Sequence, residues 1–279
     1  MAECEQKPMK TTQRGVTLVT GASSGIGLAT ARALRREGFR VFGTSRKRTG
    51  DNSDGITMLV CDVTDDASVQ QAVHEVQSRE GRIDLLVNNA GIGLLGGAEE
   101  SSQEQVKALF DVNVFGVMRM TNAVLPMMRR QQIGRIINLS SVLGLIPAPY
   151  NALYAATKHA VEGYSESLDH EVRTQGIRVV LIEPGVTRTA FEENITRPDH
   201  PLPLYDRIRA DAEKFMREIV DKGDAPEVVA EAVVRAANTP APRRRYTAGK
   251  AAAQVRFVRR FLPESFVDKS LRKFNRLPA

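Results

Sequence analysis

Cysteine is scarce in this sequence, and its placement argues against two kinds of site. The only two cysteines among 279 residues, Cys4 and Cys61, lie far apart and have no CxxC or Cys/His spacing. We therefore expect neither a disulfide framework nor a metal site, and reduced thiols are typical of a cytoplasmic protein. Spacing for metal or triad chemistry is also missing among the four histidines, which are His74, His159, His170 and His200.

Signals for export or membrane insertion are missing as well. Residues 1–14 are polar and lack the apolar core of a signal peptide, so we interpret them as a flexible tail. Residues 136–157 carry no charge, but their prolines, asparagines and serines exclude a continuous lipid-facing helix. We expect no transmembrane segment.

Positive charge is concentrated at one end of the chain. The net charge is +6, yet eleven Lys and Arg against two acidic residues follow position 242, so residues 1–242 are slightly acidic. Because the body of the chain is not basic, we expect no nucleic-acid partner.

Apolar runs rich in β-branched residues alternate with amphipathic segments. This alternation is typical of a parallel sheet covered on both faces. The fold class is therefore α/β, with a doubly wound, Rossmann-like parallel sheet in a single domain at 15–249 and a helical C-terminal extension at 250–279. The expected strands are 16–20, 40–44, 56–60, 83–88, 135–139, 177–182 and 245–248, and the expected helices are about 25–37, 66–80, 101–130, 151–174, 205–222 and 226–238. Four prolines in 184–203 predict a long, mobile connection.

A glycine-rich turn follows the first expected strand and opens the first expected helix. It reads TGASSGIG. Glycines permit a tight turn and close approach of the backbone, and amides at a helix N-terminus attract phosphate. The alternative is an ordinary glycine-rich turn. We predict a dinucleotide site that includes Gly21, Ser23, Ser24, Gly25, Ile26 and Gly27.

The residues after the second and third strands bear on the choice of cofactor. Ser45 stands where NAD-specific sites place an acid, and Arg46, Lys47 and Arg48 follow it. An arginine there accommodates the 2′-phosphate of NADP, so we predict NADPH/NADP+ rather than NAD(H). A solvated basic loop is the alternative. Asp62, followed by Val63, is placed either to accept a hydrogen bond from adenine or to form a turn.

Tyr154 and Lys158 lie four positions apart in a helical pattern and therefore share one face. An ammonium beside a phenol favours the phenolate, and a nicotinamide's positive charge would add to that effect. Polar or glycine-containing segments follow other strands, where the ligand crevice is expected. They contain Ser141, Asn89, Ala90, Gly91, Pro184, Gly185, Val186, Thr187 and Thr189, and Asn113 lies in the helical segment at 101–130.

Jointly these motifs resemble the short-chain dehydrogenase/reductase family, strongly over about 15–190. The resemblance implies that Tyr154 is the general acid and base, that Lys158 tunes it and binds the nicotinamide ribose, and that Ser141 orients the substrate oxygen. It also implies that Asn113 holds a water in a relay to Lys158, that Thr187 and Thr189 contact the cofactor, and that Asn89 borders it. The C-terminal extension is similar to that of the 17β-hydroxysteroid-dehydrogenase-like branch.

Apolar residues around the expected pocket predict a hydrophobic substrate with a carbonyl or alcohol, such as a steroid, retinoid or lipid. They are Ile92, Leu94, Leu95, Leu143, Leu145, Ile146, Pro147, Pro149, Tyr150 and Phe191. Two alternatives stay open: a reductase or dehydrogenase for acyl thioesters or small alcohols, and an inactive dinucleotide-binding sensor or scaffold.

Two features predict further contacts. The segments 104–129 and 151–174 are apolar on more than one face, which predicts a homodimer or homotetramer. In the basic extension, one apolar stripe consists of Ala251, Val255, Val258 and Leu262, and a second of Val267, Leu271 and Phe274. These helices either dock on the domain beside the pocket or contact an anionic membrane surface, which would place the protein peripherally at a membrane.

Overall fold

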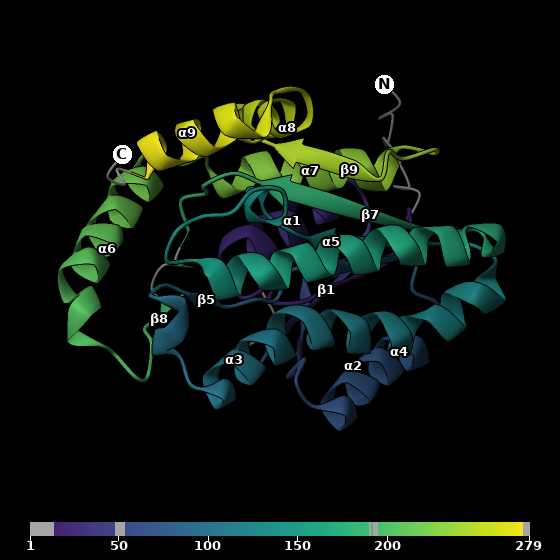
Figure 1. Ribbon diagram of the computed structural model, residues 1–279. Helices are drawn as coiled ribbons and strands as arrows, with labels where there is room; N and C mark the ends of the chain where they lie inside the picture. The colour runs from purple at the N-terminus through teal and green to yellow at the C-terminus, as the bar shows by residue number, and fades with distance from the viewer. Residues whose placement is uncertain (1–13, 48–53, 190, 192–194, 276–279) are drawn as a thin grey trace, which may run out of the picture.

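A seven-stranded parallel sheet forms the centre of the chain in a computed structural model, which describes residues 14–47, 54–189, 191 and 195–275 (Figure 1). The strand order is β3-β2-β1-β4-β6-β7-β9. The strands are β1 Val16–Val19, β2 Arg40–Ser45, β3 Thr57–Val60, β4 Leu85–Asn88, β6 Gly134–Leu139, β7 Ile177–Pro184 and β9 Arg245–Ala248. The predicted doubly wound α/β fold is thereby confirmed.

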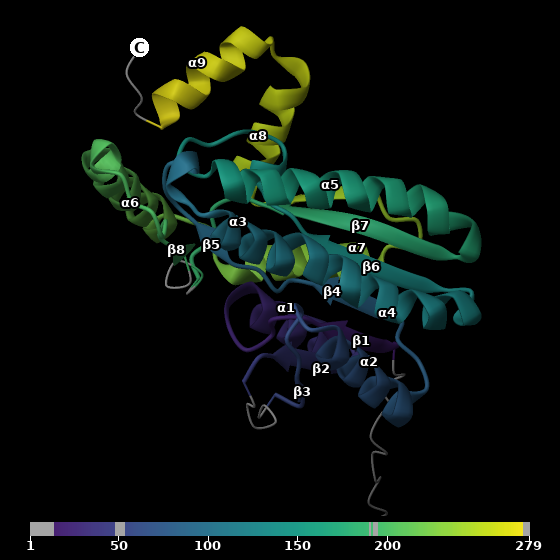
Figure 2. The same cartoon turned by 60° about the horizontal axis from the view of Figure 1, so that its bottom comes forward.

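Helices cover both faces of this sheet. Their bounds are α1 Gly25–Arg36, α2 Asp66–Glu80, α3 Gln103–Phe110, α4 Gly116–Gln131, α5 Ala152–Val172, α6 Asp206–Asp221, α7 Pro226–Asn238, α8 Lys250–Phe261 and α9 Glu264–Phe274. Helices α2, α4 and α5 pack on one face, and α1 and α7 pack on the other. In Figure 2, α8 and α9 project from the body of the domain, and α9 reaches toward α6.

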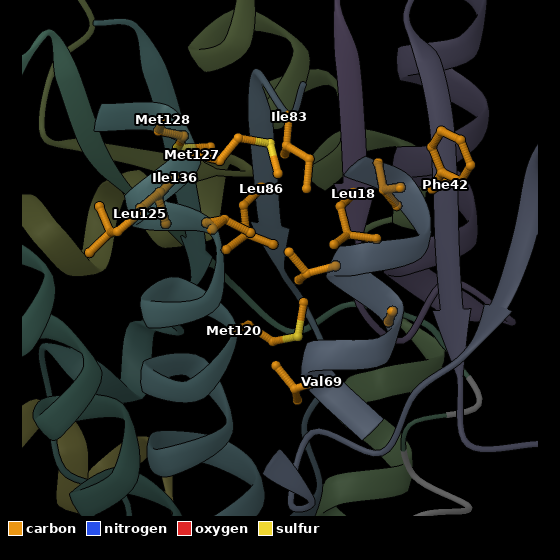
Figure 3. Packing of buried hydrophobic residues seen from close by; sticks show 14 of the residues in the cluster. Leu18, Phe42, Val69, Ile83, Leu86, Met120, Leu125, Met127, Met128 and Ile136 are labelled. Carbon is orange, nitrogen blue, oxygen red and sulfur yellow. The ribbon is translucent and has the colours of Figure 1, made fainter. Parts of the chain in front are cut away.

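Strand residues alternate between the two apolar cores, as the period of a β-strand requires. In β4, Leu86 joins the core beneath α2 and α4, whereas its neighbours Leu85 and Val87 face α1 and α7. Ile136 and Ile137 in β6 divide in the same way. Figure 3 shows the first core, where methionines of α4 meet side chains of the central strands. Burial on both faces explains why these strands are apolar throughout.

Two segments differ from the sequence-based expectation. The helix expected at 101–130 is divided into α3 and α4 by a π-helical turn at Asp111–Phe115. In the connection expected at 184–203, the short strand β8 (Ile195–Thr196) pairs in parallel with β5 (Gly93–Leu94). Residues 190 and 192–194 of that connection lie outside the described residues, as do Cys4 and Arg48.

The strand order reverses direction at β1, which has β2 on one side and β4 on the other. In open α/β sheets the ligand crevice lies at such a switch point, outside the carboxyl ends of the strands. The glycine-rich turn follows β1, and the segment Asn89–Gly91 follows β4. The fold therefore brings these two predicted cofactor segments side by side.

Candidate active site

A cavity of about 1970 Å³ lies at the carboxyl ends of the strands and extends beneath α6, α8 and α9. Loops that follow β1, β2, β3, β4, β6 and β7 contribute to its wall. Most of the predicted site residues line it: Gly21, Ser23, Ser24, Gly25, Ile26, Ser45, Arg46, Asp62, Val63, Asn89, Ala90, Gly91, Ser141, Tyr154, Lys158, Pro184, Gly185, Val186, Thr187 and Thr189. Gly27 and Asn113 are not part of this wall.

The glycine-rich turn is shaped by left-handed backbone and very close packing. Gly21 and Gly25 have φ values of +64° and +54°, which favour glycine. A Cβ on Gly27 would lie 2.1 Å from the carbonyl oxygen of Gly21, so this glycine permits the turn to pack on α1. The Asn89 side-chain amide donates to the carbonyl oxygens of Thr20 (3.0 Å) and Gly21 (3.1 Å). The start of α1 thus faces the cavity with an open backbone cradle, which suits a pyrophosphate.

Beyond this turn, the wall is formed by the ends of β2 and β3. The hydroxyl of Ser45 donates to the carbonyl oxygen of Lys47, and Arg46 is exposed at the cavity edge. Oδ1 of Asp62 accepts from the Thr64 amide (2.9 Å) and hydroxyl (2.8 Å), which is the turn-forming role. These Thr64 bonds, with a smaller contribution from the charge of Arg46, lower the pKa of Asp62.

The loop after β7 closes over the glycine-rich turn. Thr187 donates its hydroxyl to the Gly185 carbonyl oxygen at 3.2 Å, which holds the loop in a tight turn. A Cβ on Gly25 would lie 3.4 Å from Cβ of Thr189, so the loop and the start of α1 are in near contact. Thr187 and Thr189 therefore reach the same end of the cavity as the phosphate cradle.

Tyr154, Lys158 and Ser141 meet in the middle of the cavity wall. Tyr154 and Lys158 occupy the first two turns of α5, and the Lys158 Nζ atom lies 5.6 Å from the Tyr154 ring centre. Lys158 donates to the Leu139 carbonyl oxygen at 2.9 Å. Ser141, directly after β6, accepts from the Leu143 amide at 3.1 Å, and its hydroxyl also forms a hydrogen bond with Tyr154.

Burial dominates the acid–base properties of this group. It raises the pKa of Tyr154, and the hydrogen bond with Ser141 acts in the opposite direction. Burial also lowers the pKa of Lys158 to about 8, against the raising effect of the Glu162 charge. The expected net lowering of the Tyr154 pKa by Lys158 is therefore wrong for the chain itself, because desolvation of the phenolate is the larger effect. A protonated phenol at neutral pH is the state that can donate a proton.

Asn113 occupies the π-helical turn between α3 and α4. Its amide donates to the Ile92 carbonyl oxygen (2.9 Å) and the Thr157 hydroxyl (3.2 Å), and its Oδ1 accepts from the Ile92 amide (2.9 Å). π turns inside α-helices are frequent at functional sites. Asn113 thus ties the segment after β4 to α5, next to Lys158, from behind the cavity wall.

The far end of the cavity is mostly apolar, and Arg207, Asp211 and Lys214 of α6 are charged members of its wall. Nine of the ten apolar residues expected there line it, and Leu145 does not. The two predicted apolar stripes of the extension also line the cavity, except for Leu262. From the sequence, α6 was not expected in the wall. Its amphipathic pattern signals a buried face, but sequence alone does not tell which surface that face covers. The α6 residues in the wall include Ile208, Phe215, Met216, Ile219 and Val220.

In the part of the chain that the structure describes, no cluster of three or more His, Cys, Asp or Glu side chains is arranged to hold a metal ion. Within the same residues, no helix is both long and apolar enough to cross a bilayer.

Comparison with known proteins agrees with this geometry. A family model described as short chain dehydrogenase matches residues 15–200. The chain therefore belongs to the short-chain dehydrogenase/reductase family and is an NAD(P)-dependent oxidoreductase.

Three curated relatives are similar over most of their length. A 3-ketodihydrosphingosine reductase from Bacteroides thetaiotaomicron is 39% identical, with 94% of this chain and 98% of the relative covered. The human 17-beta-hydroxysteroid dehydrogenase type 1 is 38% identical, with 84% of this chain and 77% of the relative covered. Retinol dehydrogenase 8 from Bos taurus is 36% identical, with 81% and 78% covered.

Solved structures share the fold. A short-chain dehydrogenase from Streptomyces avermitilis superposes with a TM-score of 0.79 at 32% identity, with 94% of this chain and 96% of that chain covered. A serine dehydrogenase complexed with NADP+ gives 0.71 at 28% identity, covering 83% and 93%. A 3-ketoacyl-(acyl-carrier-protein) reductase from Brucella melitensis complexed with NADH gives 0.69 at 28% identity, covering 81% and 94%.

Proposed function

We propose that this protein uses NADP(H) to interconvert a carbonyl and a secondary alcohol on a hydrophobic substrate. One observation carries the proposal: Ser141, Tyr154 and Lys158 line a single cavity between a phosphate cradle and an apolar chamber. If the cradle holds the pyrophosphate of a dinucleotide, the hydride donor would lie near Tyr154, the proton donor, where an apolar ketone can also bind. Bringing the two reactants together in this way is a large part of catalysis.

In the reducing direction, the Tyr154 hydroxyl donates its proton to the substrate oxygen, which the Ser141 hydroxyl orients and polarises. The ammonium of Lys158 lies beside the phenol and would donate a hydrogen bond to the nicotinamide ribose. Asn113 supports this arrangement by fixing Ile92 and Thr157, and a water relay from Asn113 to Lys158 belongs to the same proposal. The bound cofactor supplies the hydride.

Each predicted cofactor segment has a role in this arrangement. The amides of Ser23–Gly27 hold the pyrophosphate, Arg46 binds the 2′-phosphate, and Asp62 uses its Oδ2 atom for the adenine amine. Asn89, Ala90 and Gly91 border the cofactor, while Thr187 and Thr189 contact its carboxamide and phosphate side. The cofactor residues of this proposal reach the cavity at five separate strand ends, those of β1, β2, β3, β4 and β7, which is the arrangement an extended dinucleotide needs.

The apolar end of the cavity favours a lipid-like, steroid-like or retinoid-like substrate over a sugar. The names of the three curated relatives denote sphingoid, steroid and retinol substrates. The test is NADPH oxidation by the purified protein against ketones and aldehydes of these classes, with acyl thioesters, small ketones and sugars for comparison. Reduction of a sugar or an acyl thioester in preference to every hydrophobic carbonyl would overturn the substrate class. No turnover with any of them, despite NADPH binding, would favour a sensor.

The outer faces of α4 and α5 support the homodimer or homotetramer expected from sequence. Phe115, the last residue of the π-helical turn before α4, is 48% exposed, and the exposed positions on α5 include the small residues Ala152, Ala156 and Gly163. A second copy packed there would cover this surface. We expect a dimeric or tetrameric mass by light scattering at micromolar concentration, and a monomer for Phe115→Glu. A monomeric wild type would contradict this assembly.

Helices α8 and α9 contact the domain through the apolar stripes that line the cavity, yet other apolar side chains of these helices are exposed to solvent. Phe257, Phe261 and Phe266 are each more than half exposed, and α8 and α9 carry seven Lys and Arg against two acids. Aromatic and basic groups on amphipathic helices suit an anionic membrane surface. We expect co-sedimentation with vesicles containing phosphatidylserine, weakened by Phe257→Ser with Phe261→Ser. Equal binding to neutral and anionic vesicles, or none, would contradict this membrane contact.

A further inference from the structure

A buried cluster of charged side chains lies directly behind Lys158. Glu162 on α5 is 4% exposed, and Glu183 on β7 is fully buried. Arg245 on β9 joins them, with Nη1 at 2.6 Å from Glu162 and 3.1 Å from Glu183. Two outer members complete the cluster: Glu166, 3.0 Å from Arg245, and Arg256 on α8, 3.8 Å from Glu183.

Glu162 connects this cluster to the catalytic groups on two sides. It lies one helical turn after Lys158 on the same face of α5 and acts electrostatically on that ammonium. Its carboxyl also lies beside Ser140, the neighbour of Ser141, since a Cβ on Gly144 would lie 2.7 Å from Oγ of Ser140 and 3.2 Å from Oε1 of Glu162. A Cβ on Gly144 would lie 2.9 Å from Cγ of Glu162, so the short turn after Ser141 packs directly on this side chain.

With Glu162 ionised, the carboxylates that contact Arg245 and Arg256 outnumber these two guanidinium groups by one, while Arg244 and His170 act on the outer Glu166. Three carboxylates (Glu162, Glu166 and Glu183) face two guanidinium groups (Arg245 and Arg256). A buried carboxylate is costly unless cations compensate for it. The ammonium of Lys158 supplies the remaining positive charge. It stabilises the carboxylates, and they in turn stabilise the protonated form of Lys158.

We propose that Glu162 is a positioning residue for the reaction, which keeps Lys158 charged and supports the turn that carries Ser141, with Arg245 as its counter-ion. Through Arg245 and Arg256 it also links the C-terminal segments to the active site. Burial raises the pKa of Glu162 to about 7, although Ser140 and Arg245 act against it. The carboxylate is thus ionised over the alkaline range in which Lys158, with its pKa of about 8, loses its proton.

The test is Glu162→Gln, which keeps the shape and removes the charge. Because Glu162 raises the pKa of Lys158, the variant lowers that pKa, by about one unit or more for two charges within one helical turn. NADPH affinity, titrated from pH 6 to pH 9, should then match the wild type at pH 6 and fall about tenfold below it at pH 9. The alkaline limb of kcat/KM should move to lower pH by the same amount.

Glu166→Gln is the matched control, because it also removes a carboxylate from Arg245 but lies two turns from Lys158. It should keep the wild-type pH profile. A wild-type profile in Glu162→Gln, or a loss that is equal at every pH, would overturn the proposal, since a purely structural role has no such pH dependence. Should Glu162→Gln not fold, Glu162→Asp moves the charge away from Lys158 and should give a smaller shift in the same direction; an unshifted profile there would equally overturn it.

This inference rests on the proposed function for the kcat/KM profile and for the contact of Lys158 with the ribose, which the NADPH affinity of Lys158→Ala tests separately. The NADPH titration needs no substrate, so it still reports on Glu162 if no carbonyl is reduced. Failure of the substrate assay alone therefore contradicts the proposed function, whereas an unshifted NADPH titration contradicts the role of Glu162.

Discussion

Replacing Tyr154 with phenylalanine is expected to abolish measurable turnover while leaving NADPH affinity nearly unchanged. The substitution removes one hydroxyl, the proton donor that forms a hydrogen bond with Ser141, and keeps the ring that packs 6.1 Å from Phe191. A positioned general acid contributes about 10²–10⁴-fold to a rate. Lys158→Ala should instead lower both turnover and NADPH affinity, because its ammonium serves the phenol and the ribose.

Tyr164→Phe provides the matched control on the same helix. Its hydroxyl is hydrogen-bonded to Thr121 and does not line the cavity, so turnover should stay near that of the wild type. Steady-state kinetics and a fluorescence titration of NADPH measure both effects. Turnover by Tyr154→Phe within tenfold of the wild type would show that another group delivers the proton.

The same site gives different pH dependences for the two directions of reaction. Burial raises the pKa of Tyr154, so the phenol stays protonated through the neutral range and its protonation does not limit reduction there. Oxidation of an alcohol requires Tyr154 to accept a proton, and its rate should rise with pH.

The central fold could be predicted because its signals are local. Apolar runs such as 177–182 are long enough to identify buried strands, and α1 begins where the glycine-rich turn indicates. Their order along the chain then limits the topology, since parallel strands need crossover helices. The short pair β5 and β8 could not be predicted, because two-residue strands have no period to detect.

The sequence predicted which residues form the site better than it predicted the pKa values of their side chains. The spacing of Tyr154 and Lys158 places both on one helical face, and the structure agrees. The direction of the Tyr154 pKa shift depends instead on desolvation by neighbours distant in sequence. The cluster behind Lys158 was missed for the same reason: Glu162 and Arg245 lie 83 positions apart and meet only when β9 pairs with β7.

The choice between NADPH and NADH rests on the end of β2. Ser45 provides no carboxylate for a ribose 2′-hydroxyl, and its own hydroxyl is engaged with the carbonyl oxygen of Lys47. Arg46 lies at the cavity edge, and its charge helps to lower the pKa of Asp62. A charge-assisted hydrogen bond contributes about 1.5–3 kcal/mol. NADPH should therefore bind about ten- to a hundredfold more tightly than NADH.

Ser45→Asp combined with Arg46→Ala is expected to erase or reverse this preference without a change in the catalytic residues. The new carboxylate repels a 2′-phosphate and accepts from a 2′-hydroxyl, and the loss of Arg46 removes the attraction. Lys47→Ala is the control, since this exposed neighbour carries the same charge but does not line the cavity. It should change the ratio of affinities only slightly. Titration of both cofactors into the three proteins measures the effect. Equal affinities of the wild type for NADH and NADPH would mean that Arg46 is a solvated loop residue.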